Sequence, residues 1–214
     1  MFRKKFSIVI AFSFSSLVSS HYTIPDLIVG GTNTGYWVNV KKTNNFDSQA
    51  PVTDVTSIDL RCYTSQSNAV ASTATVEAGS TIGIQADGPI YHPGVINVYM
   101  AKAPENNVAS WDGDGAVWFK VFEISAVTDG GDHHLPWDSF AIPKNLPDGQ
   151  YLVRTEQIAL HAASTFGGGK KFIINKDNPL DCTQINVTNG GSGTPGPLGP
   201  FLELGILINI YYHE

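Results

Sequence analysis

Turn-forming pairs of residues recur along this chain at short intervals, and helical periodicity between them is scarce. The turns include Gly30-Gly31, Asp112-Gly113, Asp148-Gly149 and Asn189-Gly190. Between them lie short runs rich in β-branched and aromatic residues, which is typical of strands. The pattern predicts an all-β fold, an immunoglobulin- or fibronectin-like antiparallel β-sandwich with long surface loops.

We expect the strands at residues 71–78, 81–85, 95–101, 117–124, 150–159 and 204–212. The stretches 33–56 and 104–116 lack a strand pattern and are expected to be surface loops. Loops of this length on a rigid sandwich often carry function. The segment 190–200 is rich in Gly, Ser and Pro but is too short for an interdomain linker.

The first twenty residues are typical of a secretory signal peptide. Three basic residues precede the apolar run 6–14, and small residues follow it up to Ser20. The apolar run is too short for a membrane span, which needs about 20 apolar residues. Because Val18 and Ser20 suit the cleavage motif, we expect a cut after Ser20 that makes His21 the first residue of a secreted protein.

Residues 21–214 fit one domain, since single all-β sandwiches often reach this length. Without Arg3, Lys4 and Lys5, the 13 basic residues fall to 10 against 19 acidic ones, so the net charge is −9 with His neutral. This balance argues against nucleic acid and anionic membranes as partners and suits an uncharged polymer. We expect the protein to be a monomer.

The chain has two cysteines, Cys62 and Cys182. In an oxidising compartment, one disulfide is expected more often than two free thiols. The triplet Asn186-Val187-Thr188 is an acceptor for N-glycosylation, although such triplets are unused about as often as they are used.

A histidine at the mature N-terminus has two metal donors on one residue, the α-amine and the ring Nδ1. These two nitrogens of His21, with one further imidazole, would give three nitrogen ligands in a T shape, which suits copper. The second candidate is His92, which lies in a turn-rich segment with Pro93 and Gly94. Taken singly, each of these histidines is more often a residue without a metal role.

The other histidines are weaker candidates. His161 ends an apolar run and is either a core residue or a residue just behind a metal site. His133 and His134 lie in a polar stretch and are expected to be solvated, and His213 is near the C-terminus.

Ten sequence blocks, taken in order, carry a resemblance to one family. They are HYTIP at 21–25, PVTDVTS at 51–57, IYHPG at 90–94, VYMAKAP at 98–104, VWFK at 117–120, IPKNLP at 142–147, GQYLVR at 149–154, EQIALH at 156–161, GSGTPGP at 191–197 and GILINIYY at 205–212. Together they resemble the fungal lytic polysaccharide monooxygenases of auxiliary activity family 9, formerly glycoside hydrolase family 61. The resemblance covers nearly all of residues 21–214.

The resemblance implies a copper site. The family's two copper-binding histidines correspond to His21 and His92, and the histidine that orients the oxygen species corresponds to His161. Cys62 and Cys182 match one family disulfide pair. One copper ion per chain, reduced by a small reductant or a redox enzyme, would react with O₂ or H₂O₂.

The same resemblance implies a substrate. The enzyme would cleave cellulose or another β-1,4-glucan by oxidation at C1, at C4 or at both. Tyr36, Trp37 and Tyr212 are candidates for glucan contact, with ordinary packing an equally open interpretation.

Two positions depart from the family pattern. Nine and eleven residues after His161, where the family has a glutamine and an axial tyrosine, an ungapped count gives Lys170 and Phe172. The spacing in segment 173–181 is longer than in the family, and the segment 200–205 is shorter. Either the chain is a diverged member with a changed site, or its gene model has misplaced exon edges.

The sequence leaves two alternative functions to consider. A glycoside hydrolase needs two carboxylates facing one bond, and the positions of Asp54, Asp59, Glu123 and Glu156 do not indicate such a pair. The stronger alternative is a non-catalytic copper- or glucan-binding protein of the same fold, whose altered residues near the copper have lost turnover.

Overall fold

The computed structural model describes residues 22–52, 57–67, 70–90, 94–124, 139–159 and 180–200. The strands in these ranges are β1 (Asp26–Val29), β2 (Thr32–Asn33), β3 (Ala74–Glu77), β4 (Thr81–Gln85), β5 (Gly94–Lys102), β6 (Ala116–Ile124), β7 (Phe140–Ala141), β8 (Gly149–Ala159), β9 (Leu180–Thr188) and β10 (Gly199–Pro200). Two short 3-10 turns, η1 (Ile58–Leu60) and η2 (Pro104–Asn106), lie in the connections.

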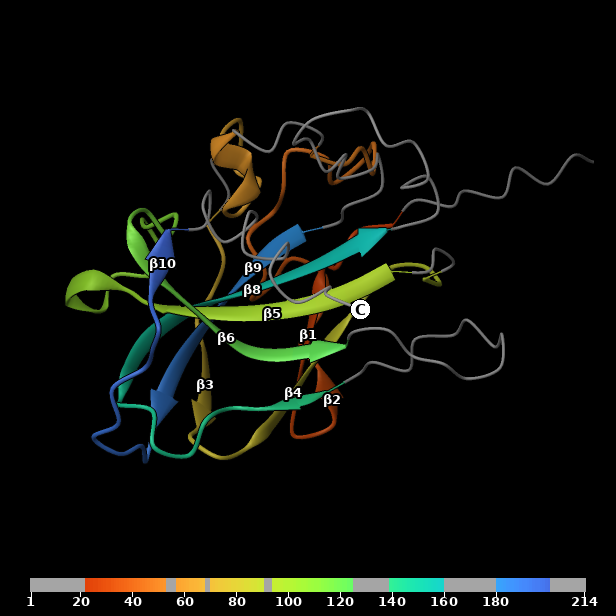
Figure 1. Ribbon diagram of the computed structural model, residues 1–214. Helices are drawn as coiled ribbons and strands as arrows, with labels where there is room; N and C mark the ends of the chain where they lie inside the picture. The colour runs from red at the N-terminus through yellow and green to blue at the C-terminus, as the bar shows by residue number, and fades with distance from the viewer. Residues whose placement is uncertain are drawn as a thin grey trace, which may run out of the picture.

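The strands form two sheets, with the order β2-β1-β4-β7 in one and β10-β6-β5-β8-β9-β3 in the other (Figure 1). The predicted all-β sandwich is confirmed. Most neighbouring strands are antiparallel, as predicted, but β3 runs parallel to β9, with Ala74 opposite Ile185. The larger sheet is therefore mixed.

The main core lies between the two sheets. From the smaller sheet, Leu27 and Ile84 are fully buried, and from the larger sheet Met100 and Val153 are fully buried in the same cluster. Burial of each such side chain contributes roughly 1.5–3 kcal/mol before entropy costs are counted. This core fixes the two sheets face to face.

A second core lies on the outer face of the larger sheet. Side chains alternate along a strand, so Tyr99 and Leu152 point away from the main core. They are buried against Val52, Leu60 and Val108, which come from the connecting segments. Because both faces of β5 and β8 are covered, even the polar residues of these strands, such as Asn97, Arg154 and Gln157, are buried.

The two predicted surface loops need a correction. The described part of segment 33–56 after β2, residues 34–52, is irregular as expected, but Val40 is fully buried and forms a bridge with Thr183. The amide of Lys41 donates to the carbonyl of Cys182 at 2.9 Å, so these residues pair with β9 where β3 does not. Segment 104–116 likewise places Val108 in the second core. Both segments cover the sheet as well as forming surface.

Five of the predicted strands are confirmed, with shifts of at most three residues at their ends. The sixth, 204–212, lies outside the described residues. Strands β1, β2, β7, β9 and β10 were not predicted from the sequence. The Gly30-Gly31 turn joins β1 to β2 with φ values of 58° and 77°, as a two-residue hairpin turn of type I′ requires.

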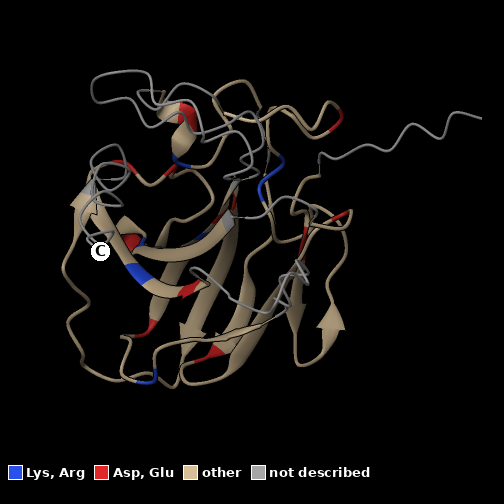
Figure 2. Cartoon of the chain, turned by 45° about the vertical axis from the view of Figure 1, so that its right-hand side comes forward, with Lys and Arg blue, Asp and Glu red and all other residues tan. Residues whose placement is uncertain are grey.

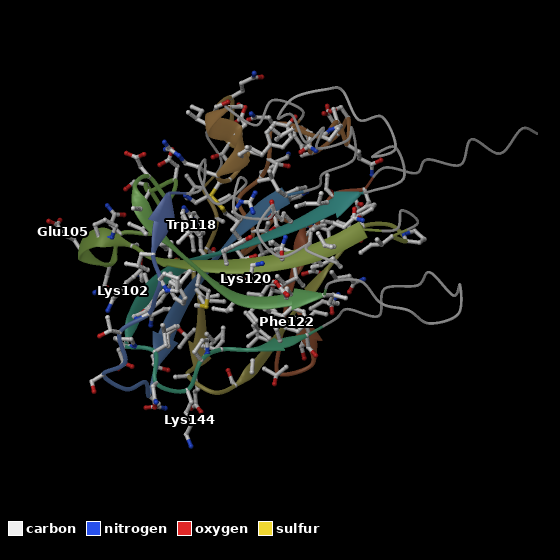
Figure 3. The ribbon with its side chains drawn as sticks, viewed as in Figure 1. Lys102, Glu105, Trp118, Lys120, Phe122 and Lys144 are labelled. Carbon is white, nitrogen blue, oxygen red and sulfur yellow. A yellow bond between two sulfur atoms is a disulfide. The ribbon has the colours of Figure 1, made fainter. Side chains whose placement is uncertain are left out.

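A bulge in β6 turns two consecutive side chains toward the main core. Val98 is opposite Phe122, but the next residue, Tyr99, is opposite Lys120, so Val121 is the extra residue. Val121 and Phe122 therefore both pack against the main core, while Lys120 lies over the ring of Tyr99 (Figure 3). The bulge lets one strand serve both faces of the sheet.

Candidate functional site

Two strand ends that lead toward predicted site residues are neighbours in the larger sheet. β5 begins at Gly94, two residues after His92, and β8 ends at Ala159, two residues before His161. Gly94 and Ala159 are paired in the antiparallel register. Figure 1 shows these two ends side by side, close to the red start of the described chain.

The described chain starts at Tyr22, directly after His21, and is anchored to β8. The Tyr22 side chain is 3% exposed, and its hydroxyl donates to Oε1 of Gln157 at 2.7 Å. Gln157 is fully buried and lies two residues before the end of β8. The N-terminal segment is thus bound to the strand that leads toward His161.

The next residue, Thr23, is anchored to the segment that leads toward His92. Its amide donates to Oδ1 of Asp87 at 2.8 Å, and its hydroxyl donates to Oδ2 at 2.6 Å. The amide of Asp87 donates back to the carbonyl of Thr23 at 3.0 Å. A Cβ placed on Gly88 would lie 3.6 Å from the Cβ of Tyr22. Three chain segments therefore converge at this end of the sandwich.

Glu156, on the second-core face of β8, is engaged in a buried network. Arg154 donates from Nη2 to Oε2 of Glu156 at 2.9 Å, and Asn97 donates to Oε1 at 3.2 Å. Arg154 also donates from Nε to the carbonyl of Leu60 at 2.8 Å. Burial and the charge of Glu156 raise the pKa of the Tyr99 phenol. Both oxygens of the Glu156 carboxylate are therefore already engaged by donors inside the fold.

The other acidic residues weighed for hydrolysis are also engaged or not described. Glu123 pairs with Lys120 at 2.7 Å, and Asp59 accepts from Ser65 at 2.9 Å. Asp54 lies outside the described residues. Figure 2 shows acidic and basic positions interspersed over the described chain. The described carboxylates named here therefore give no support to a hydrolase pair.

Two of the three predicted glucan-contact residues are described. Tyr36 is 54% exposed, and Trp37 is half-buried with a φ of 62°. The amide of Trp37 donates to the carbonyl of Pro25 at 2.8 Å, which ties this turn to the N-terminal segment. Tyr212 lies outside the described residues. An exposed tyrosine on a turn held to the N-terminal segment is available for contact with a ligand.

The predicted disulfide is confirmed. Cys62 and Cys182 are bonded, with a Cα–Cα distance of 5.1 Å across 120 residues of sequence. On the chain-entropy model, closing a loop of this length stabilises the fold by roughly 4–5 kcal/mol, less any strain. The bond joins the segment just after η1 to β9 and so holds this outer segment on the sheet.

Asn186 is the third residue from the end of β9 and is half-buried. The hydroxyl of Thr188, the last residue of its triplet, donates to the carbonyl of Val76 at 3.3 Å. Glycosylation at Asn186 stays a prediction.

The predicted copper ligands are not among the described residues. His21, His92 and His161 lie outside the described ranges, and so do Lys170 and Phe172. Within the described ranges, the structure brings together no group of three or more His, Cys, Asp or Glu side chains that would hold a metal ion. In that same part of the chain, none of the helices has the length and apolar character of a membrane span.

Sequence reasoning missed Tyr22, Gln157 and Asp87. Each lies within seven residues of a histidine that it did single out, and that proximity was the available signal. Their contacts join residues 64 and 135 positions apart, which short-range patterns do not reveal.

Comparison with known proteins assigns nearly the whole chain to one family. The model of auxiliary activity family 9, formerly GH61, matches residues 21–214. The AA9 family lytic polysaccharide monooxygenase H of Malbranchea cinnamomea is 44% identical over 210 residues, which cover 92% of this chain and 88% of that protein. The AA9 family lytic polysaccharide monooxygenase D of Phanerodontia chrysosporium is 46% identical over 224 residues, which cover 97% of this chain and 92% of that protein.

Solved structures show the same fold. A cellulose-active polysaccharide monooxygenase from M. thermophila superposes with a TM-score of 0.63 at 27% identity and 85% coverage of both chains. Cel61B of Hypocrea jecorina superposes with a TM-score of 0.65, at 24% identity and with 86% and 88% coverage, and supports the fold alone. Members of the family are secreted enzymes that use an external reductant and O₂ or H₂O₂. The chain belongs to auxiliary activity family 9, the copper-dependent lytic polysaccharide monooxygenases.

Proposed function

We propose that this protein is secreted after a cut behind Ser20 and acts as a one-domain monomer with one copper ion. The α-amine and Nδ1 of His21, with the imidazole of His92, are the proposed ligands. Three nitrogen donors of this kind suit copper, which also leads the divalent affinity order. The family match begins at His21, which supports the cut. Because the amine must lose a proton to bind, copper affinity should weaken in acid.

The observation that carries this proposal is the convergence of three chain segments. Tyr22 directly follows His21, the first proposed ligand. Strand β5 begins at Gly94, two residues after His92, the second proposed ligand. Tyr22 bonds to β8, Thr23 bonds to Asp87, and β8 pairs with the start of β5. Consecutive Cα atoms are about 3.8 Å apart, so these anchors limit how far the two proposed ligands can lie from each other.

The proposed reaction is oxidative cleavage of a β-1,4-glucan such as cellulose. When bound and reduced, copper would supply the chemistry that activates O₂ or H₂O₂ to remove hydrogen from C1 or C4 of a glycosidic link. The protein's own residues bind and position. Tyr36 and Trp37 offer rings to the glucan, and His161 would orient the oxidant by hydrogen bonding. An uncharged polymer suits the acidic protein, and a relative of known structure is described as cellulose-active.

Mass spectrometry of the soluble products from cellulose tests this function. With copper and a reductant, the protein should release oligosaccharides that carry aldonic acid or 4-keto ends. Samples without reductant, or with copper removed by a chelator, should release none. If the products carry only ordinary reducing ends, or form equally well without reductant, the function is wrong.

A second candidate is a copper- or glucan-binding protein without turnover. The observation that favours it is the pair Lys170 and Phe172, at the family's glutamine and tyrosine positions. Phenylalanine lacks the phenol oxygen, and a lysine cation replaces a neutral amide donor. Residues that orient the partners of a metal often matter for activity more than for metal capture.

The double variant Lys170→Gln with Phe172→Tyr separates the two candidates. We expect the unmodified protein to bind copper but to release few oxidised products, and the double variant to release several-fold more with little change in copper affinity. Product yield and calorimetric Cu(II) affinity, measured on both proteins, check this. If the yield is unchanged, or is already that of an ordinary member, the ungapped count from His161 is wrong. A residue within 173–181 would then close the site.

A further inference from the structure

We infer that Tyr22 and Gln157 are a pair of positioning residues that set where the α-amine of His21 can lie. The inference rests on the proposed copper site and adds two residues to it that do not touch the metal. The Tyr22 hydroxyl donates to Oε1 of Gln157 at 2.7 Å, and both side chains are buried.

The pair joins the start of the mature chain to β8, one of the three converging segments. Gln157 lies two residues before the end of β8 and is opposite Ile96, the third residue of β5. The Tyr22 ring belongs to the main core, in the same cluster as Ile24 and Ile84. Burial of the ring thus holds the N-terminal segment against the main core. The hydrogen bond of the hydroxyl fixes the position of this segment along β8.

The first residue of a chain has no preceding residue to hold it. Its amine can be oriented only through its own side chain and through the residues that follow. Here the two following residues are held from two sides, Tyr22 by β8 and Thr23 by Asp87. A buried hydrogen bond meets little competition from water, so it restricts direction as well as distance. Loss of the Tyr22 bond should therefore loosen one proposed copper ligand and leave the fold intact.

The test is Tyr22→Phe, with Tyr151→Phe as its matched control. Tyr151, like Tyr22, is a buried tyrosine of the main core, and it lies on β8. Its hydroxyl donates to the carbonyl of Pro147 at 2.8 Å. It lies near the opposite end of the strand, paired with Lys102. Each variant removes one oxygen atom and the hydrogen bond named here.

We expect both variants to melt a few degrees lower than the unmodified protein. Only Tyr22→Phe should weaken Cu(II) binding, by about five- to tenfold, which is what the loss of one net hydrogen bond corresponds to. Only Tyr22→Phe should also change the electron paramagnetic resonance spectrum of bound Cu(II). Equal affinities and spectra in the two variants would overturn the inference.

A second pair of variants distinguishes a loss of Cu(II) affinity caused by misplacement of His21 from one caused by a general loss of stability. Gln157→Met removes the acceptor and leaves the Tyr22 hydroxyl without this bond. The double variant, Tyr22→Phe with Gln157→Met, removes both the donor and the acceptor. The double variant should regain melting temperature but keep the weakened Cu(II) affinity. If affinity recovers together with stability, the pair is only structural. If the unmodified protein itself fails to bind Cu(II), the proposed function has failed, which is a different result.

Discussion

His92→Ala is expected to lower Cu(II) affinity by at least about 100-fold while the melting temperature changes by only a few degrees. The variant removes one of three proposed nitrogen ligands. Loss of groups that merely orient metal ligands already costs roughly 10- to 100-fold. The fold should persist because His92 precedes β5, which begins at Gly94, and the sequence His92-Pro93-Gly94 is typical of a turn and not of a core position. Calorimetric titration with Cu(II) measures the affinity.

His134→Ala is the matched control for this prediction. It removes the same imidazole from a polar stretch that no part of the proposed site uses. Its Cu(II) affinity should equal that of the unmodified protein. Unchanged affinity in His92→Ala would remove His92 from the site, and an equal loss in both variants would show that copper binds to surface histidines.

Much of the fold was predictable because turns and strands depend on nearby residues. Gly30-Gly31 supplies the two positive φ angles that a tight hairpin needs. The run from Val95 to Ala101 is apolar on both faces because β5 has a core on each side. Signals of this kind are local, and sequence reasoning detects them.

The strand β9 was missed because three of its buried residues are polar. Asp181, Thr183 and Gln184 are fully buried, although such residues usually face water. Burial raises the pKa of Asp181 well above its usual range. The segment around Val40, which pairs with the backbone of this part of β9, is irregular and far away in sequence. Only the folded chain shows that this segment closes the edge of β9.

The site was predictable in part, for a related reason. His21 was identified by the cleavage pattern and by resemblance, which are both sequence properties. The anchors around it, Tyr22 with Gln157 and Thr23 with Asp87, depend on contacts between distant segments. Their role follows from the register of β5 and β8, which the sequence does not specify.

The free α-amine of His21 is the most demanding part of the proposed mechanism. A protein that begins with one extra alanine before His21 should keep its fold, because the contacts of Tyr22 and Thr23 are unchanged. It should nevertheless lose oxidative activity almost completely. The added peptide bond turns the amine into an amide, which no longer donates a lone pair to a metal at neutral pH.

The most direct measurement is the yield of oxidised oligosaccharides from cellulose, compared between the protein that starts at His21 and the one with the extra alanine. Both receive equal copper and reductant, and equal melting temperatures of the metal-free proteins confirm that both are folded. We predict oxidised products from the first protein and only background from the second. Equal yields from the two proteins would contradict a copper site built on the amine of His21.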